Sequence, residues 1–215
     1  EITTRLVGSE MCIRDRLKTK YPDFYGRQIK GDYIECVMQN VSNVFRIALV
    51  IKSYIKSFPI TENKKAKNFQ TYGIRTAIGI GNMRIVNTEQ GIWDGEAIYM
   101  SGRSLEGMNA LNKGTLSVCT SKRQLSCSLQ TIALLTDAIM NDMTLRQSEV
   151  IYYKLLGLKE TDIARNLGIS QSGVNKASSA TKWYCIEEAL KFFEQINFNE
   201  YESVSYTHLT LPTIR

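Results

Sequence analysis

The sequence has little of what metal sites, disulfide frameworks and membrane spans require. It contains a single histidine, His208, and its cysteines show no CxxC spacing, which argues against a zinc site. We expect buried, reduced thiols instead. No secretory signal and no run of about 18 apolar residues is present, so we expect a soluble, cytoplasmic protein without membrane contact. The formal charge of +6 permits binding to nucleic acid.

The two ends of the chain are related at the level of DNA. If MCIRD at residues 11–15 is written with the codons ATG TGT ATA AGA GAC, the reverse complement translates as VSYTH, which stands at residues 204–208. Both stretches also look like translated sequencing adapters. We therefore interpret residues 1–16 and 203–215 as adapter artefacts and expect them not to pack against the rest. On this interpretation the first strand of the protein lies upstream and is missing.

Hydrophobic periodicity outlines an α+β region followed by helices. The α+β region is expected to hold, in order, a hairpin over residues 25–37, a helix over 41–58, a strand over 73–81, a helix over 94–111 capped by Asp94, and a strand over 115–119. With a lost first strand, this order is compatible with a ferredoxin-like sheet that carries its helices on one face. We expect this domain to cover residues 17–140 and an all-α domain to cover residues 141–200.

A helix-turn-helix pattern stands at residues 160–177 (ETDIARNLGISQSGVNKA). Ala164 is the small residue that two steeply crossing helices need where they touch, and Gly168 suits a left-handed turn between them. Apolar side chains at four positions can pin both helices to a third one: Ile163, Leu167, Ile169 and Val174.

The segment from about Thr144 to Leu190 resembles the helix-turn-helix of LuxR-type regulators and of sigma-factor region 4. This resemblance implies that the second helix enters the major groove of duplex DNA. The candidates for base contacts are Gln171, Ser172 and Asn175, and those for phosphate contacts are Ser170, Lys176 and Lys182. The alternative is a fold of this type that contacts only protein.

Residues 31–37 (GDYIECV), 74–85 (IRTAIGIGNMRI) and 94–105 (DGEAIYMSGRSL) are similar to class III nucleotide cyclases and closer still to SatD-family bacterial proteins. The resemblance matches Asp32 to a metal-binding aspartate and Arg103 to a transition-state arginine. Tyr99, however, stands where a cyclase carries asparagine, and the other metal aspartate would lie upstream of Leu17.

These departures imply a cyclase-like domain that senses or dimerises without catalysis. No cofactor is expected, and Mg²⁺ or Mn²⁺ would bind only if Asp32 binds metal. A small anionic or nucleotide ligand would lie near Asp32, Arg75 and Arg103.

We interpret the chain as a bacterial transcription regulator, not an enzyme, whose partner is duplex DNA and which is compatible with a homodimer. One alternative is an active metal-dependent nucleotide cyclase or nucleotidyltransferase with a DNA-binding appendage. The other alternative is an interaction adaptor that touches only protein.

Overall fold

The computed structural model describes residues 13–30, 33–61, 63, 66, 68–69, 71–111, 114–198 and 206–214. After a helix over residues 13–20 come β1 (Tyr25–Lys30), β2 (Tyr33–Met38), η1 (Val41–Asn43), α2 (Val44–Lys56), β3 (Gly73–Ile74), β4 (Thr76–Gly81), β5 (Met83–Asn87), β6 (Ile92–Gly95), α3 (Glu96–Leu111), β7 (Leu116–Thr120), α4 (Arg123–Asn141), α5 (Leu145–Leu155), α6 (Glu160–Leu167), α7 (Gln171–Ala180), α8 (Trp183–Gln195) and β8 (Tyr206–Ile214). The mixed α+β class is confirmed. No helix within these ranges is long and apolar enough to cross a membrane.

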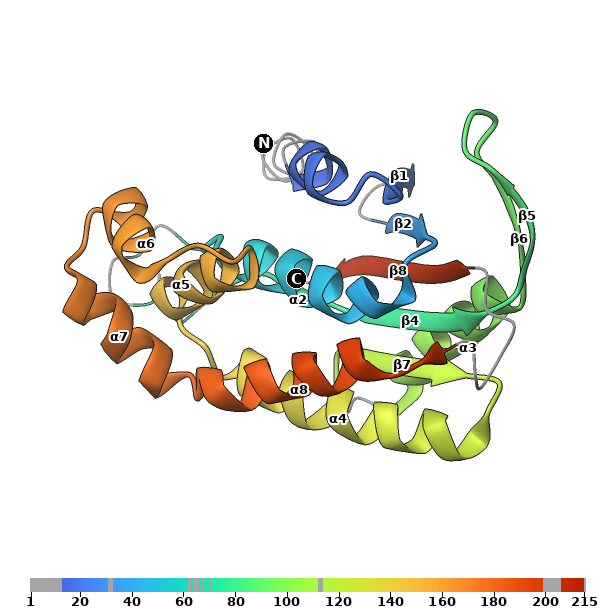
Figure 1. The fold of residues 1–215 in the computed structure, drawn as a ribbon. Helices are drawn as coiled ribbons and strands as arrows, with labels where there is room; N and C mark the ends of the chain where they lie inside the picture. The colour runs from blue at the N-terminus through green and yellow to red at the C-terminus, as the bar shows by residue number, and fades with distance from the viewer. Residues whose placement is uncertain are drawn as a thin grey trace.

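The main sheet has the strand order β1-β2-β8-β4-β7, and β3 also pairs with β8 (Figure 1). Strands β4 and β7 are parallel, whereas β8 runs antiparallel to both of its long neighbours, β2 and β4. Strands β5 and β6 form a separate two-stranded ribbon that projects from one end of the sheet. The predicted hairpin over residues 25–37 is confirmed by the β1–β2 pairing, although its tip at residues 31–32 lies outside the described residues.

Helices cover both faces of this sheet, so the expected arrangement on one face is wrong. On one face, α3 approaches β4 so closely that a Cβ at Gly79 would collide with the Ala97 carbonyl oxygen. On the other face, Ile78 and Leu209 belong to the core that α2 also lines. Every residue of β4 is buried, and so are residues 207–211 of β8. Strands buried on both sides need two covering layers.

Strand β8 contradicts the expectation that the terminal segments do not pack. It forms the centre of the sheet, and His208, Leu209 and Leu211 are all buried. Ile13, at the other end, is also buried in the core. The expectation is therefore wrong for residues 13–16 and 206–214, whereas residues 1–12, 203–205 and 215 lie outside the described residues. The adapter origin of the DNA stays a hypothesis.

The sequence of β8 explains how such a segment enters a sheet. Its residues alternate, so that Leu209 and Leu211 point to the α2 side while His208 and Thr210 point to Ser101 on α3. Ladder hydrogen bonds are made by the backbone and need no particular side chain. A segment with a period of two and β-prone Tyr, Thr and Ile residues can therefore pair wherever two strand edges are free.

The start of α3 differs from the predicted cap at Asp94. Asp94 belongs to β6, and its carboxylate accepts hydrogen bonds from Arg84 Nε at 2.8 Å and from Tyr99 Oη at 3.0 Å. The hydrogen bonds from Arg84, and then from Tyr99, lower the pKa of Asp94. The sequence did not predict the β5–β6 ribbon, because its strands are short and their apolar residues do not alternate regularly; Ile85 and Ile92 are exposed.

The helices after residue 121 are those that the periodicity predicted, and they share a core with the sheet. One cluster of buried side chains contains Met140 of α4, Ile151 of α5 and Phe193 of α8 together with residues of α2 and the sheet. Arg46 of α2 also forms a 2.7 Å ion pair with Glu194 of α8. The division into two domains near residue 141 stays a prediction. In the structure the residues on either side of this point share one core.

We expect Leu211→Ala to destabilise the protein by about 2–5 kcal/mol, because it removes a fully buried side chain from the central strand. The control is Ile29→Ala on β1, where the side chain is 47% exposed and the expected change is within about 0.5 kcal/mol. Urea unfolding of both variants measures the difference. Equal stability of wild type and Leu211→Ala would show that β8 does not occupy the sheet.

Acidification should destabilise the protein through its one histidine. Burial, followed by the charge of Arg27, lowers the pKa of His208 to about 4, against about 6.5 in an unfolded chain. The unfolded state therefore takes up a proton first, and stability falls as the pH drops from about 6.5 to about 4. At pH 5 this contribution amounts to about 2 kcal/mol.

The measurement is urea unfolding at several pH values for wild type and for His208→Gln, which lacks the titrating ring. We expect a shallower pH dependence for the variant between about pH 4 and 6.5. The same pH dependence in both proteins would refute a buried, neutral His208.

Candidate nucleic-acid interface

Helices α6 and α7 are joined by a tight turn at residues 168–170. Gly168 has φ 62° and ψ 37°, which is the left-handed conformation that the sequence predicted for it. The amide of Ile169 donates to the Ala164 carbonyl at 3.0 Å and so closes the end of α6. The hydroxyl of Ser170 then accepts from the Gly173 amide at 3.1 Å and caps the start of α7. Local hydrogen bonds thus fix the direction change between the helices.

Helix α5 supports this pair. It begins with a capping box, in which the Thr144 amide donates to Gln147 Oε1 at 2.8 Å and the Gln147 amide donates to Thr144 Oγ1 at 3.4 Å. Lys154 near its end forms a 3.1 Å ion pair with Glu160 at the start of α6. The capping box fixes the start of α5, and the ion pair ties its end to α6.

A small apolar cluster sets the rotation of α7. Val150 of α5, Ile163 and Ala164 of α6 and Val174 of α7 are buried against one another. The other two predicted apolar contacts, Leu167 and Ile169, are partly buried against the same cluster. Because Val174 faces inward, the opposite face of α7 faces solvent.

The predicted base-contacting side chains lie on that solvent face. Gln171, Ser172, Asn175 and Lys176 are all exposed, and their spacing of one and four residues places them on one side of the helix. Within the described residues, Asn175 and Lys176 make no hydrogen bond or ion pair through their side chains. These two side chains are therefore available to a partner, and those of Gln171 and Ser172 lie exposed beside them.

The two other predicted contacts lie at opposite ends of α7. Ser170 is exposed, but its hydroxyl is engaged in the cap and lies 2.9 Å from Ser172 Oγ. Lys182 is exposed in the turn before α8, with φ 52°. A ten-residue helix is about 15 Å long, so these residues could reach different phosphates but not the same one.

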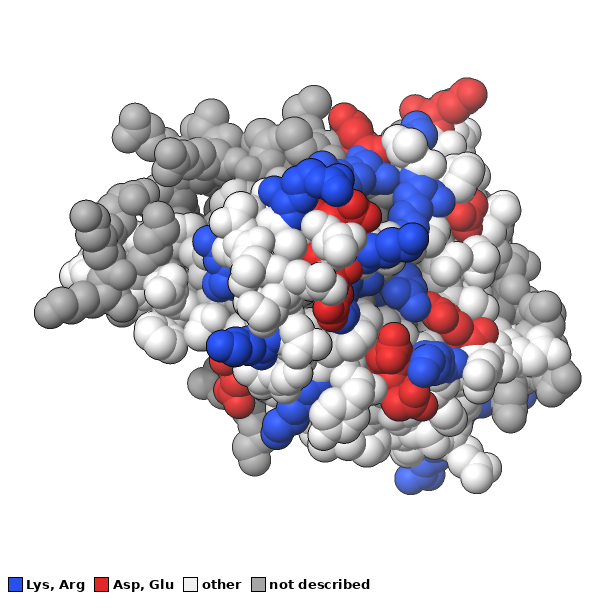
Figure 2. All heavy atoms as spheres, turned by 60° about the vertical axis from the view of Figure 1, so that its left-hand side comes forward, with Lys and Arg blue, Asp and Glu red and all other residues white. Residues whose placement is uncertain are grey.

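Charge on this side of the molecule is mixed. Figure 2 shows Lys and Arg side chains interspersed with Asp and Glu over the face that includes the left-hand end of Figure 1. Helix α7 itself has no acidic residue, and Lys176 is its single charged one. The acidic residues of α6 are compensated within the fold, since Asp162 pairs with Arg165 at 3.2 Å and Glu160 with Lys154.

The predicted ligand site in the α+β region is not brought together by the described residues. Asp32 lies outside them. Arg75 lies in the link between β3 and β4, with its Nε buried and without a hydrogen-bond partner there, whereas Arg103 is exposed on α3. None of the described contacts joins these two arginines.

No group of three or more His, Cys, Asp or Glu side chains in the described part of the chain could hold a metal ion. Its four cysteines are free thiols, as predicted, but only Cys36 is buried; Cys127 is exposed. The expectation of buried thiols is thus wrong for Cys127, which lies on the outer side of α4.

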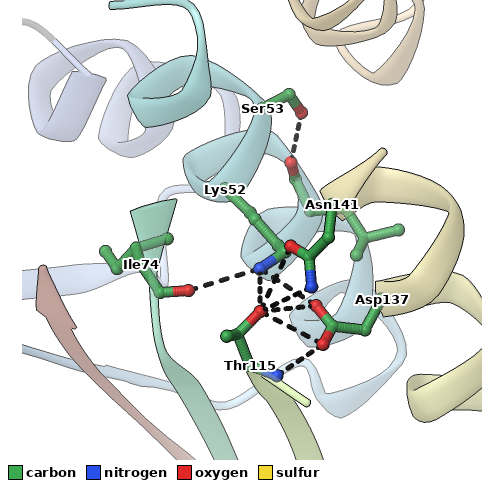
Figure 3. A network of polar contacts seen from close by, with 7 residues as sticks. Lys52, Ser53, Ile74, Thr115, Asp137 and Asn141 are labelled. Carbon is green, nitrogen blue, oxygen red and sulfur yellow. Dashed lines mark hydrogen bonds and ion pairs between the residues drawn. The ribbon is translucent and has the colours of Figure 1, made fainter. Parts of the chain in front are cut away.

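A buried polar network, which was not among the sequence predictions, joins α2, the sheet and α4 (Figure 3). Lys52 of α2 is 2% exposed, and its Nζ lies 3.0 Å from Asp137 Oδ1 of α4. The same ammonium donates to Thr115 Oγ1 at 2.6 Å and to the Ile74 carbonyl at 3.3 Å. Burial lowers the pKa of Lys52, and the charge of Asp137 opposes this effect.

Thr115, just before β7, completes the network. Its hydroxyl donates to Asp137 Oδ1 at 2.8 Å, its amide donates to Oδ2, and Asn141 Nδ2 donates to its hydroxyl at 3.1 Å. The two helices and two strands are thereby joined at one point. The network orients these elements relative to one another.

Helical spacing could have revealed the network. Lys52 follows Ala48 by four residues and Asp137 follows Ala133 by four, so each charge lies on the buried stripe of its helix. Opposite charges on the buried faces of two helices are expected to pair, because a buried charge without a partner is costly.

Comparisons with known proteins yield no relative: no family model, no curated protein and no solved structure matches the chain.

We expect Lys52→Met to cost about 3–5 kcal/mol of stability, because it leaves the Asp137 carboxylate buried without its cation. The double variant Lys52→Met/Asp137→Leu should be less destabilised than the sum of the two single variants by about 1 kcal/mol or more. Lys56→Met, one helical turn further along α2 and only partly buried, is the control. Strictly additive free energies of unfolding would contradict the ion pair.

Proposed function

We propose that this protein binds duplex DNA through α7 and acts as a transcription regulator, with an α+β region that senses a ligand or dimerises without catalysis. The observation that carries the proposal is the solvent face of α7. It presents Gln171, Ser172, Asn175 and Lys176 from a helix whose rotation is fixed by buried contacts.

The geometry suits the major groove, which admits one α-helix. Asn175 and Gln171 can each offer a donor and an acceptor to the edge of an adenine. Lys176 can reach a phosphate beside the groove, and Lys182 can reach one at the far end of α7. The Ser170 hydroxyl can donate to a phosphate while it accepts from the Gly173 amide.

The helix-turn-helix resemblance agrees with this assignment. The mixed charge of the surrounding surface bears on how strongly the protein would bind DNA of random sequence. A face without a continuous basic patch gives weak attraction to random DNA. Base contacts then account for a larger share of the affinity for the preferred site. A cytoplasmic location would follow from a DNA partner.

A non-catalytic α+β region is supported at Tyr99. The cyclase resemblance requires an amide at this position, and Tyr99 offers a phenol that donates to Asp94. Arg75, whose Nε is buried without a partner among the described residues, is the side chain that best fits a small anionic ligand.

Selection of bound sequences from a random duplex pool tests the function. We expect Asn175→Ala to weaken binding to the selected site by about 1–3 kcal/mol and to affect random DNA little. Lys176→Ala should weaken binding to both by similar factors and should reduce the salt slope by about one unit.

Lys191→Ala is the matched control, because Lys191 is an exposed lysine on α8 that pairs with Glu188. It should bind as wild type does. If the folded protein enriches no sequence and binds no duplex at low salt, the adaptor function replaces this proposal.

A further inference from the structure

The outer face of α4 carries no formal charge. Between Arg123 and Asp142 the helix has one charged residue, Asp137, and this side chain is buried in the network with Lys52. The exposed positions are Gln124, Cys127, Ser128, Thr131, Leu134, Leu135, Ala138 and Asn141. A helix face exposed to water usually carries charged residues, so this face is unusual for a surface.

Two adjacent leucines stand near the middle of this face. Leu134 is 48% exposed and Leu135 is 63% exposed. Ala133 and Met140, by contrast, are buried in the core on the inner side of α4. Helix α4 lies along the lower edge of the molecule in Figure 1, beside α8, so its outer side faces away from the sheet.

We propose that this outer face of α4 is a two-fold interface, on which α4 of a second copy of the chain packs in antiparallel orientation. The pattern of exposed residues is nearly symmetric about the middle of the helix. When the helix is reversed about its midpoint, Thr131 lies opposite Leu134, Cys127 opposite Ala138 and Gln124 opposite Asn141. The same patch thus meets itself, which is the requirement for a two-fold contact.

Charge complementarity at the ends of the helix favours a second copy as the occupant. Arg123, exposed at the start of α4, would lie opposite Asp142, exposed just after its end, and the symmetric arrangement repeats this pair. The uncharged middle avoids the like-charge contacts that a charged face would make with its own copy. Antiparallel helices also place opposite dipole ends together.

The mass of the protein in solution tests the interface without DNA, so its outcome does not depend on the proposed function. Sedimentation of the full chain should give a dimer. Leu135→Glu places like charges near the two-fold axis and should weaken the dimer by about 100-fold or more. Ile85→Glu is the control, since Ile85 is a 44% exposed side chain on β5, and it should leave the dimer intact. Circular dichroism checks that each variant is folded.

Cross-linking tests the register. The free thiol of Cys127 would face Ala138 of the second copy, so Ala138→Cys should form a disulfide-linked dimer under mild oxidation, while wild type should not. Cys127→Ser/Ala138→Cys should lose the link. A monomeric wild type, a dimer insensitive to Leu135→Glu, or a link that is absent in Ala138→Cys or survives in the double variant would each overturn the proposal.

Discussion

The backbone pairing of β8 with both β2 and β4 holds the sheet together. On one side of it lies the β1–β2 hairpin and on the other the parallel pair β4–β7, and these two halves share no other strand ladder among the described residues. Both faces of β8 are used, since Leu209 and Leu211 complete the core beneath α2 and His208 meets Ser101 of α3. The two helical layers are therefore positioned through one strand.

The network around Lys52 and Asp137 holds helices α2 and α4 against the sheet. It links α2 and α4 to the strand ends at Ile74 and Thr115, and α2 is in turn tied to α8 through Arg46 and Glu194. Because a buried charge tolerates few alternative arrangements, this pair restricts how the helical part docks on the sheet. Helix α4 thus has a charged residue on its inner side and an uncharged outer side, the reverse of a usual surface helix.

The α6–α7 unit depends less on these long-range contacts. Its cap at Ser170, its left-handed Gly168 and its cluster around Val174 come from residues close together in the sequence. The proposed DNA-contacting face is consequently set by local geometry, whereas a ligand site in the α+β region would combine residues from separate elements. This difference explains why the α7 side chains lie together as predicted while Arg75 and Arg103 do not.

The sequence by itself determined the elements whose signals are local: the β1–β2 hairpin, α2, the succession of helices after residue 121 and the turn at Gly168. The single strand predicted over residues 73–81 is divided at Arg75 into β3 and β4. Periodicity and turn chemistry act over a few residues, so a short window contains them. Only the tertiary structure decided that β8 enters the sheet, that helices cover both faces and that Asp94 binds Arg84 in place of capping α3. Strand partners and buried charge pairs are chosen by what lies adjacent in space, and a one-dimensional pattern does not contain that information.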